Sequence, residues 1–246
     1  MIVWTIVVLL IITILWLSQD RYNAICREEL DHELHLKGQL SDKEQSKVWL
    51  RSRFPELREM IPKTLFGTKD MSALRTYLKS DKCPQQFVLK NTHGSRMNVV
   101  VDDKDEMNAD ALVGKARKFL ATRFHETGKP ARRRQMHYEY NDPKIIIEEF
   151  LGEDLVDLKY HIVDGELVFF QRMHGGEEEV FYPEDASPEL LQVATKIYDG
   201  INKEAKTPIR LVRVDFFSRY GKNYVGEITF SPGMCAKTRP YLIGKL

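Results

Sequence analysis

The end of the chain places charged residues on one face of a predicted β-hairpin. Because side chains alternate along a strand, Arg213 and Asp215 share one face, and the apolar residues beside them take the other. If the hairpin turns at Gly221, Asp215 lies opposite Glu227. Arg213 then lies opposite Thr229. Facing carboxylates repel each other, and a magnesium ion, which binds carboxylate and phosphate oxygens, would relieve that repulsion. The spacing favours a magnesium and phosphate site over a solvated face with charges placed at random.

The strand end at Lys90 is a second candidate for phosphate binding. Phe87–Lys90 is apolar up to the lysine, and the polar loop Asn91–Arg96 that follows contains Gly94 and Ser95. A lysine supplies a point charge, and backbone N–H groups of a glycine loop can close over phosphate oxygens. Strand-ending lysines and glycine turns are common, so this element indicates a nucleotide only in combination with others.

A third candidate is the apolar strand that ends at Glu148 and Glu149. Such a strand end can offer backbone groups and a carboxylate to the edge of an adenine, and the next two residues are apolar and could form walls. Asp154 or Asp157 could then accept hydrogen bonds from ribose hydroxyls. Taken alone, the segment is equally well interpreted as an acidic loop after a core strand.

The elements that position these residues alternate between hairpins and separate helices, which indicates the α+β class. Apolar residues at helical spacing predict helices at 68–78, 110–124 and 188–201. Apolar, β-rich runs predict strands at 87–90, 97–101, 145–150, 158–162, 167–172, 209–217 and 224–230. Asp164–Gly165 is a hairpin-turn signal. Ser41–Glu44 has capping-box spacing ahead of a further helix, which Pro55 ends.

The first residues predict a membrane anchor. Ile2–Leu17 carries no charge and would span about 24 Å as a helix, slightly less than a ~30 Å hydrocarbon core. Trp4 and Trp16 near its ends suit the membrane interface. No basic residue precedes the run and no small-residue cleavage site follows it, so we expect an uncleaved anchor. Basic residues follow the run, which favours a cytoplasmic catalytic domain.

Composition excludes several other classes of protein. With 246 residues, of which 43% are hydrophobic and 30% charged, the chain is an ordinary globular one. Lys and Arg total 37 against 36 Asp and Glu, without a polybasic tail, so no nucleic-acid partner is expected. Cys26, Cys83 and Cys235 are odd in number and show no zinc-ligand spacing. They favour a reducing compartment over a disulfide scaffold.

Other nucleotide signatures are missing from the sequence. It contains no GxxxxGK[ST] loop, no GxGxxG and no HRD catalytic loop. Asp103-Lys-Asp105 matches the short DxD pattern of nucleotide-sugar glycosyltransferases, many of which have an N-terminal anchor. The triplet lies among further charges in what we expect to be a solvated turn, so this class remains a secondary hypothesis.

Taken in order, the motifs resemble the ATP-grasp superfamily. Within it, the sequence is most similar to the TupA-like branch, named after a teichuronopeptide biosynthesis protein. The resemblance runs from about Pro62 to the end of the chain. It rests on four segments, which are Phe87–Lys90 with His93–Ser95, Ile145–Leu151, Arg213–Asp215, and Gly226–Gly233. We therefore divide the chain into an anchor (1–19), a charged helical stalk or cap (20–61) and a catalytic domain (62–246).

The resemblance implies ATP and magnesium as cofactors, with ATP held between two α+β subdomains. The residues that it places at ATP are Lys90, His93, Gly94, Ser95, Glu148, Glu149, Phe150, Leu151, Asp157 and Lys159. It makes Asp215 and Glu227 magnesium ligands, with Thr229 where most of the family has Asn, and it gives Arg213 the transferred phosphoryl group. The family's usual N-terminal substrate subdomain is replaced here by the anchor and the charged segment.

The leading functional hypothesis is carboxylate activation by ATP. An acyl phosphate would form and an amine would attack it, with catalysis by positioning and charge neutralisation, in which Lys90 and Arg213 would take part. The resemblance suggests a cell-surface polymer or a glycan-linked acceptor. The alternatives are direct phosphorylation of a hydroxyl at the same site, a membrane-anchored glycosyltransferase, and a non-catalytic scaffold. Release of ADP would separate the ligase and the phosphotransferase from the scaffold, and binding of a UDP-sugar would identify the glycosyltransferase.

Overall fold

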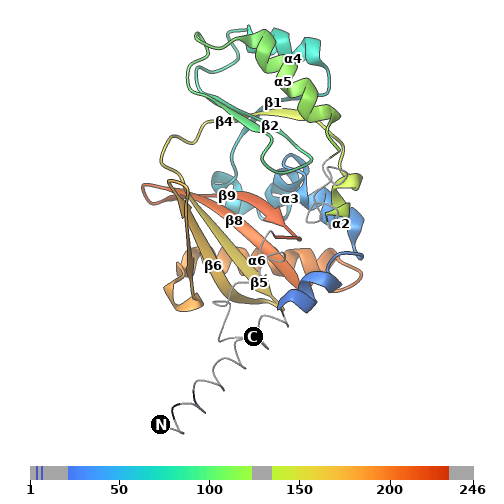
Figure 1. The fold of residues 1–246 in the computed structure, drawn as a ribbon, viewed down its shortest axis with the longest axis vertical. Coiled ribbons are helices and arrows are strands. Elements are labelled where there is room, and N and C mark those ends of the chain that lie inside the picture. The colour runs from blue at the N-terminus through green and yellow to red at the C-terminus, as the bar shows by residue number, and fades with distance from the viewer. Residues whose placement is uncertain (1–3, 5–6, 8–21, 124–134, 233–246) are drawn as a thin grey trace. The chain divides into compact units, whose positions relative to one another are not determined.

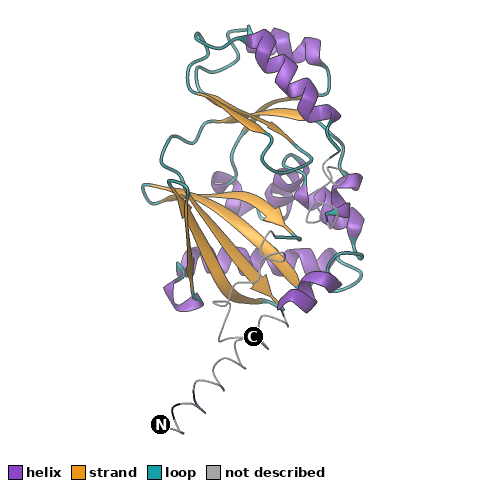
Figure 2. Ribbon diagram, viewed as in Figure 1, coloured by secondary structure: helices purple, strands orange, loops and turns teal. Residues whose placement is uncertain are grey.

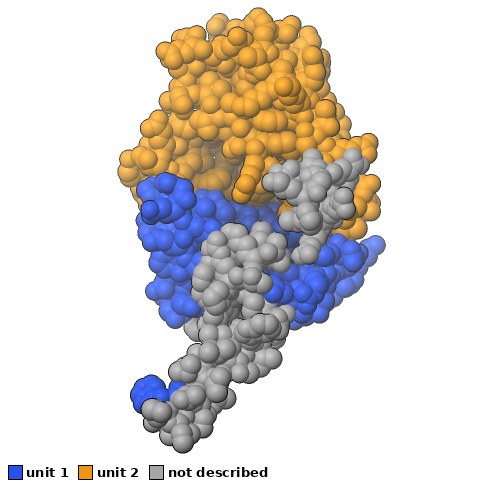
Figure 3. Space-filling model, in the orientation of Figure 1, with its two compact units in different colours: residues 1–33, 156–216, 228–246 blue, residues 34–155, 217–227 orange. Residues whose placement is uncertain are grey.

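The computed structural model describes residues 4, 7, 22–123 and 135–232, and the chain divides into two compact units. Unit 1 comprises residues 1–33, 156–216 and 228–246, and unit 2 comprises 34–155 and 217–227 (Figure 3). Each unit combines antiparallel strands with helices (Figure 2). The α+β class predicted from the sequence is therefore confirmed.

Unit 2 contains a four-stranded sheet in the order β1-β4-β2-β3. Its strands are β1 (Thr64–Thr68), β2 (Phe87–Asn91), β3 (Asn98–Val101) and β4 (Ile145–Glu149). Helices α4 (Met71–Leu78) and α5 (Ala109–Ala121) pack their apolar stripes, which include Leu74 and Leu112, against it (Figure 1). In the antiparallel register, Val88 faces Glu148 and Lys90 faces Ile146, so β2 and β4 bring the second and third candidate segments together.

The first helices of unit 2 lie in the segment that was expected to be a stalk. They are α2 (Leu34–Ser41), α3 (Gln45–Arg53) and η1 (Pro55–Met60). A further short helix of unit 2, η3 (Met136–Tyr140), comes from outside that segment. Gly38 of α2 approaches η3 so closely that a Cβ there would lie 2.6 Å from the carbonyl oxygen of His137. The helix start after Ser41 is confirmed, but Asp42 makes the cap, since its Oδ1 accepts hydrogen bonds from the N–H groups of Glu44 and Gln45.

Unit 1 contains most of a five-stranded sheet in the order β7-β6-β5-β8-β9. Its strands are β5 (Val156–Val163), β6 (Glu166–His174), β7 (Glu177–Phe181), β8 (Leu211–Arg219) and β9 (Lys222–Thr229). The β5–β6 turn is the predicted one, with φ of 51° at Asp164 and 90° at Gly165. Helix α6 (Pro188–Glu204), capped by Ser187, packs on β5 and β6, and η4 (Pro183–Asp185) precedes it.

Residues 22–28 form a helix that belongs to the core of unit 1. Tyr22, Ile25 and Cys26 are buried in one cluster with residues of β5, β6 and β8, namely Val163, Val168, Phe169 and Leu211. The predicted stalk of residues 20–61 is thus divided, with residues up to 33 in unit 1 and the rest in unit 2.

The cysteines differ from the expectation drawn from their number. Cys26 is disulfide-bonded, and Cys83 is free and buried. An odd number of cysteines says only that at least one is unpaired, and sequence separation does not prevent two from meeting in the fold. The argument for a reducing compartment from cysteine usage is therefore wrong for Cys26.

The predicted anchor lies outside the described residues, apart from Trp4 and Val7. Within the described ranges, no helix is both long enough and apolar enough to cross a membrane.

Candidate functional site

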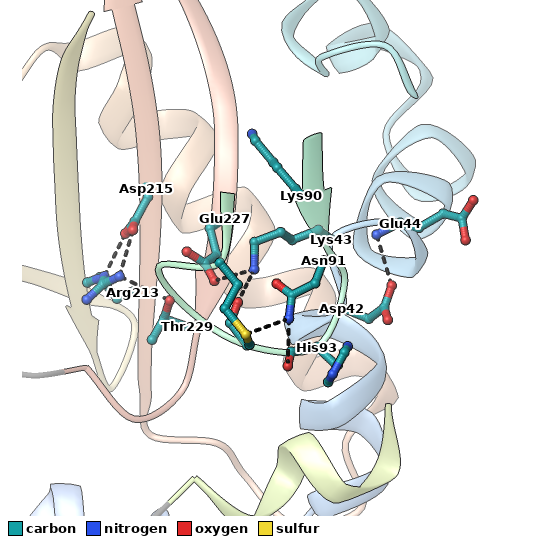
Figure 4. A network of polar contacts seen from close by, with 12 residues as sticks. Asp42, Lys43, Glu44, Lys90, Asn91, His93, Arg213, Asp215, Glu227 and Thr229 are labelled. Carbon is teal, nitrogen blue, oxygen red and sulfur yellow. Dashed lines mark hydrogen bonds and ion pairs between the residues drawn. The ribbon is translucent and has the colours of Figure 1, made fainter. Parts of the chain in front are cut away.

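In unit 1, strand β8 holds an arginine and an aspartate as a bidentate pair. Arg213 Nε and Nη2 each donate to one carboxylate oxygen of Asp215, both at 2.6 Å (Figure 4). Arg213 Nη2 also donates to Thr229 Oγ1 of β9 at 3.2 Å. The three side chains therefore share a face, because period-two alternation puts residues 213 and 215 on the same side of the strand.

The two predicted metal carboxylates each contact a cation in the structure. Asp215 is only 4% exposed and is neutralised by Arg213, and Glu227 Oε1 lies 3.6 Å from Lys43 Nζ. The carboxylates are therefore balanced by cations in this structure, unlike the uncompensated pair that the hairpin pattern suggested. Asp215, Glu227 and the hydroxyl of Thr229 supply hard oxygen donors of the type that magnesium prefers. Their shared magnesium ion remains a prediction.

In unit 2, one buried carboxylate binds two lysines. Glu148 is 2% exposed, and its Oε1 accepts a hydrogen bond from Lys90 while its Oε2 accepts one from Lys47. Lys90 comes from β2, Glu148 from β4 and Lys47 from α3, so three elements that are distant in sequence form the cluster. We call Lys47, Lys90 and Glu148 the lysine cluster.

The pKa of Glu148 shows that its carboxylate is ionised. Burial alone would raise the pKa of Glu148, but the ammonium groups of Lys90 and Lys47 outweigh it and lower this pKa to about 2. Burial lowers the pKa of Lys47, and the carboxylate of Glu148 opposes that effect. Two lysine side chains thus meet one ionised carboxylate in a poorly hydrated setting, an arrangement that favours an anionic ligand.

Lys43 links the loop after β2 to Glu227. Its Nζ donates to the carbonyl oxygen of Gly94 and lies 3.6 Å from Glu227 Oε1. Its backbone N–H donates to the carbonyl oxygen of Thr92 at 3.2 Å. Lys43 therefore lies beside the predicted phosphate loop, and it is a candidate site residue that the sequence reasoning missed.

The predicted phosphate loop is only partly open to solvent. Asn91 and His93 are buried, and His93 Nε2 lies 3.0 Å from the carbonyl oxygen of Thr122. Asn91 Nδ2 contacts the carbonyl oxygen of His93 at 3.4 Å, which fixes the start of the loop. Gly94, with φ of 147°, is buried as well, and Ser95 after it is half-buried, so Ser95 is the more accessible of the two predicted phosphate contacts.

The segment after β4, predicted to contact a nucleobase, is held by two neighbouring parts of the chain. Glu149 Oε1 accepts a hydrogen bond from Lys63 N at 2.7 Å, and Arg219 Nη1 reaches the carbonyl oxygen of Leu151 at 3.4 Å. Phe150 is half-buried. The following Gly152 has φ of 102°, and a Cβ there would lie 2.0 Å from Arg219 Nη1. The glycine thus gives Arg219 room beside Leu151.

Two further predicted site residues meet on β5. Lys159 donates to the carboxylate of Asp157, two positions away on the same face. The DxD triplet has a structural explanation, because Asp103 Oδ1 accepts from the N–H of Asp105, and Lys104 Nζ binds the carbonyl oxygens of Ser80 and Cys83. Among the residues that the structure describes, no group of three or more His, Cys, Asp or Glu could hold a metal ion.

The chain matches no protein-family model and no curated protein sequence. Its fold is similar to that of D-alanine–D-alanine ligase from Bacillus anthracis, solved with ATP (TM-score 0.47, 19% identity, 80% of this chain and 55% of that one). It is also similar to the ATP-grasp ligase PsnB with a precursor peptide and AMPPNP (0.44, 13%, 76% and 50%). A third similar structure is the D-cycloserine synthetase DcsG (0.49, 14%, 88% and 73%).

The chain spans about half the length of the first two of these ligases, at 55% and 50%. The chemistry of its site is therefore best judged from its own residues.

Proposed function

We propose that this chain is an ATP- and magnesium-dependent ligase of the ATP-grasp type. The observation that carries the proposal is the lysine cluster, in which two ammonium groups share one buried carboxylate near a glycine-containing loop. Such an excess of buried positive charge needs an anionic partner, and the triphosphate of ATP supplies one. The TupA-like motif order predicts the same ligand for Lys90 and the loop.

In the proposed reaction, a substrate carboxylate oxygen attacks the γ-phosphorus of ATP. The bond to the β,γ-bridging oxygen breaks, ADP leaves, and an acyl phosphate results. An amine then attacks the acyl carbon, inorganic phosphate leaves, and the amine loses a proton as the amide forms. We assign Lys43 and Lys90 to phosphate oxygens and Arg213 to the transferred phosphoryl group.

Magnesium, held by Asp215 and Glu227 with Thr229 beside them, would offset the negative charge of the phosphates. The chain's own part is to release both carboxylates from their cations. Arg213 would turn from Asp215 towards the phosphoryl group, and Lys43 from Glu227 towards the nucleotide. The cations that balance the carboxylates without ligand would thus become ligands of the anion.

The acceptor that we propose is a cell-surface polymer or a glycan-linked amine. The support is the resemblance to the TupA-like branch together with the uncharged N-terminal run, which would hold the enzyme at a membrane where such polymers are made. Carbonate extraction checks the anchor, since an integral protein stays in the pellet, and release of the full-length chain would contradict it.

Two features favour opposite sides of the membrane for the catalytic domain. The basic residues after the run favour the cytoplasm, whereas the disulfide at Cys26 is typical of an oxidising compartment. We propose the cytoplasmic side, since the reaction consumes ATP. Protease treatment of sealed inside-out and right-side-out vesicles decides, and digestion in right-side-out vesicles alone would contradict this orientation.

The reaction is tested with the purified full-length protein, ATP, magnesium and pooled amino acids and amino sugars. The proposal predicts release of ADP and inorganic phosphate together with an amide product detected by mass spectrometry. A phosphorylated pool compound without free phosphate would instead identify a kinase. Absence of ADP release with every pool, in a protein that also fails to bind ATP, would refute the nucleotide site.

A further inference from the structure

A buried hydrogen-bonded chain crosses unit 1 from the helix of residues 22–28 to the strands. Tyr22 Oη lies 2.9 Å from His161 Nδ1 on β5, and His161 Nε2 lies 2.9 Å from Gln171 Oε1 on β6. Gln171 Nε2 then donates to Glu178 Oε1 on β7 at 2.6 Å. Tyr22 and His161 are fully buried at 0% exposure. Burying polar groups is costly unless they are hydrogen-bonded, as these are, and none of them has a role in the reaction above.

The direction of the hydrogen bonds follows from the carboxylate end. Because the Gln171 amide nitrogen donates to Glu178, its oxygen faces His161 and must accept, so His161 Nε2 carries the proton. Burial, with the charge of Arg213 as the second cause, holds the pKa of His161 well below its usual value, so the imidazole is neutral. Nδ1 is therefore an acceptor, and the hydroxyl of Tyr22 donates to it.

His161 lies on the face of the sheet that carries Arg213. Strands β5 and β8 are hydrogen-bonded neighbours, and Asp164 N, just after β5, donates to the carbonyl oxygen of Arg210, just before β8. Antiparallel pairing from that bond puts residue 161 opposite residue 213, since each is three positions further in. The neighbouring Tyr160 points to the other face, where its ring packs edge-on against Phe216 at 5.3 Å between centroids.

Arg213 acts electrostatically on both members of the chain nearest to it. Its positive charge lowers the pKa of His161, and it opposes the increase that burial produces in the pKa of Tyr22. Arg213 is therefore bonded to Asp215, and on the same face of the sheet lies a neutral ring that cannot rotate because both of its nitrogens are bonded. A long, flexible side chain is restricted in this way to a small set of rotamers.

We propose that Tyr22 and His161 are positioning residues that fix the orientation of Arg213. Tyr22 and Gln171 hold the imidazole from its two nitrogens, and the fixed imidazole lies opposite Arg213 on the same face of the sheet. The inference builds on the proposed function, because it is Arg213 that would meet the transferred phosphoryl group. It makes the helix of residues 22–28, which directly follows the predicted anchor, a part of the catalytic apparatus.

The kinetic test compares two variants of the full-length protein, each of which lacks one buried tyrosine hydroxyl. Tyr22→Phe should lower kcat for ADP release, with ATP, magnesium and the pooled amines, by about tenfold and leave the KM for ATP unchanged. Tyr160→Phe is the matched control, since its hydroxyl lies on the α6 side near Ser187. It should leave kcat unchanged. Equal kcat values in the two variants would overturn the proposal.

The His161 position offers a rescue experiment. In His161→Gln, one amide can donate to Gln171 and accept from Tyr22, so most of the activity should remain. His161→Phe fills a similar volume without either bond and should lose kcat at least as strongly as Tyr22→Phe. If His161→Phe retained wild-type kcat, the hydrogen-bonded chain would have no positioning role.

A second readout does not depend on turnover. In ¹⁵N-labelled full-length protein, the Nε–H resonance of Arg213, assigned by its loss in Arg213→Lys, should exchange slowly with water. Exchange should become about tenfold faster in Tyr22→Phe and in His161→Phe and stay unchanged in Tyr160→Phe. Unchanged exchange in all three refutes the positioning role. A wild-type protein that shows this pattern but releases no ADP refutes only the proposed ligase.

Discussion

The lysine cluster of unit 2 and the Arg213–Asp215 pair of unit 1 differ in the ratio of cations to carboxylates. In the lysine cluster of unit 2, two ammonium groups share one carboxylate, and a positive charge is left over. In unit 1, Arg213 is matched one to one by Asp215, and the pair is neutral. The first arrangement is suited to attract an anion from solution. The second is suited to bind no anion until a competing cation binds Asp215 and releases the guanidinium of Arg213.

Removing the carboxylate of the lysine cluster should have the largest effect on stability. Glu148→Gln should lower the free energy of unfolding by about 3 kcal/mol, because it leaves two partly buried ammonium groups without a counter-charge. Denaturant unfolding without nucleotide measures the change. Glu153→Gln is the control, since it neutralises an exposed carboxylate just after the same strand and should be neutral. Wild-type stability of Glu148→Gln would show that the lysines do not depend on it.

The matched change in unit 1 should have a smaller effect. Asp215→Asn should lower the free energy of unfolding by about 2 kcal/mol, because it weakens a bidentate charge-assisted contact to Arg213. Glu227→Gln should change it by less than about 0.5 kcal/mol, since its ion pair with Lys43 is long and partly exposed. Both should abolish magnesium-dependent ADP release. The reverse order of stabilities, or wild-type turnover in either variant, would refute this assignment.

The affinity for ATP tests whether the lysine cluster binds the phosphates. Lys90→Ala should weaken ATP binding by about tenfold, because it removes one charge-assisted contact without exposing core. Isothermal titration of the folded variant measures this, with Lys69→Ala as the control, since Lys69 is exposed and pairs with Asp142 on the surface. An ATP affinity equal to that of the wild type would exclude Lys90 from the phosphate site.

As the pH falls, the buried His137 should lower the stability of the protein before the lysine cluster or the Arg213–Asp215 pair does. Burial, followed by the charge of Lys37, lowers the pKa of His137 to about 3. Between pH 6.5 and about 3, the unfolded chain binds a proton at this position and the folded protein does not, so stability falls as pH falls, by up to ~1.4 kcal/mol per pH unit. His137→Asn should reduce that slope between pH 6 and 5, measured by denaturant unfolding. An unchanged slope would show that His137 is protonated in the folded state.

The sequence predicted the parts of the fold that have a strict period. The alternation in 209–217 and 224–230 correctly placed Arg213 and Asp215 on one face and Arg213 next to Thr229. The helices at 110–124 and 188–201 were correct because their apolar stripes are long. Strands β1 and β7 were missed, since the first is not a continuous apolar or alternating run and the second begins with three glutamates.

The residues that the sequence did not yield are those whose role depends on a distant partner. Lys43 was taken as part of a capping signal, and nothing local shows that it reaches Gly94 and Glu227. Lys47 was not singled out in the sequence, yet it is buried against a strand end 101 residues away. Tyr22 stood in a segment interpreted as a stalk. Pairing across the fold, rather than residue type, makes each of them part of a site.

The docking of residues 22–28 on unit 1 limits how far the protein can reach from a bilayer. If Ile2–Leu17 spans it, only the four residues 18–21 separate the membrane from a helix that is fixed in the core. Fully extended, they cover at most about 14 Å. A ligase held so close to the bilayer would meet only acceptors that diffuse in the same leaflet or project from it. Lengthening the tether with a flexible insert would trade that confinement for reach.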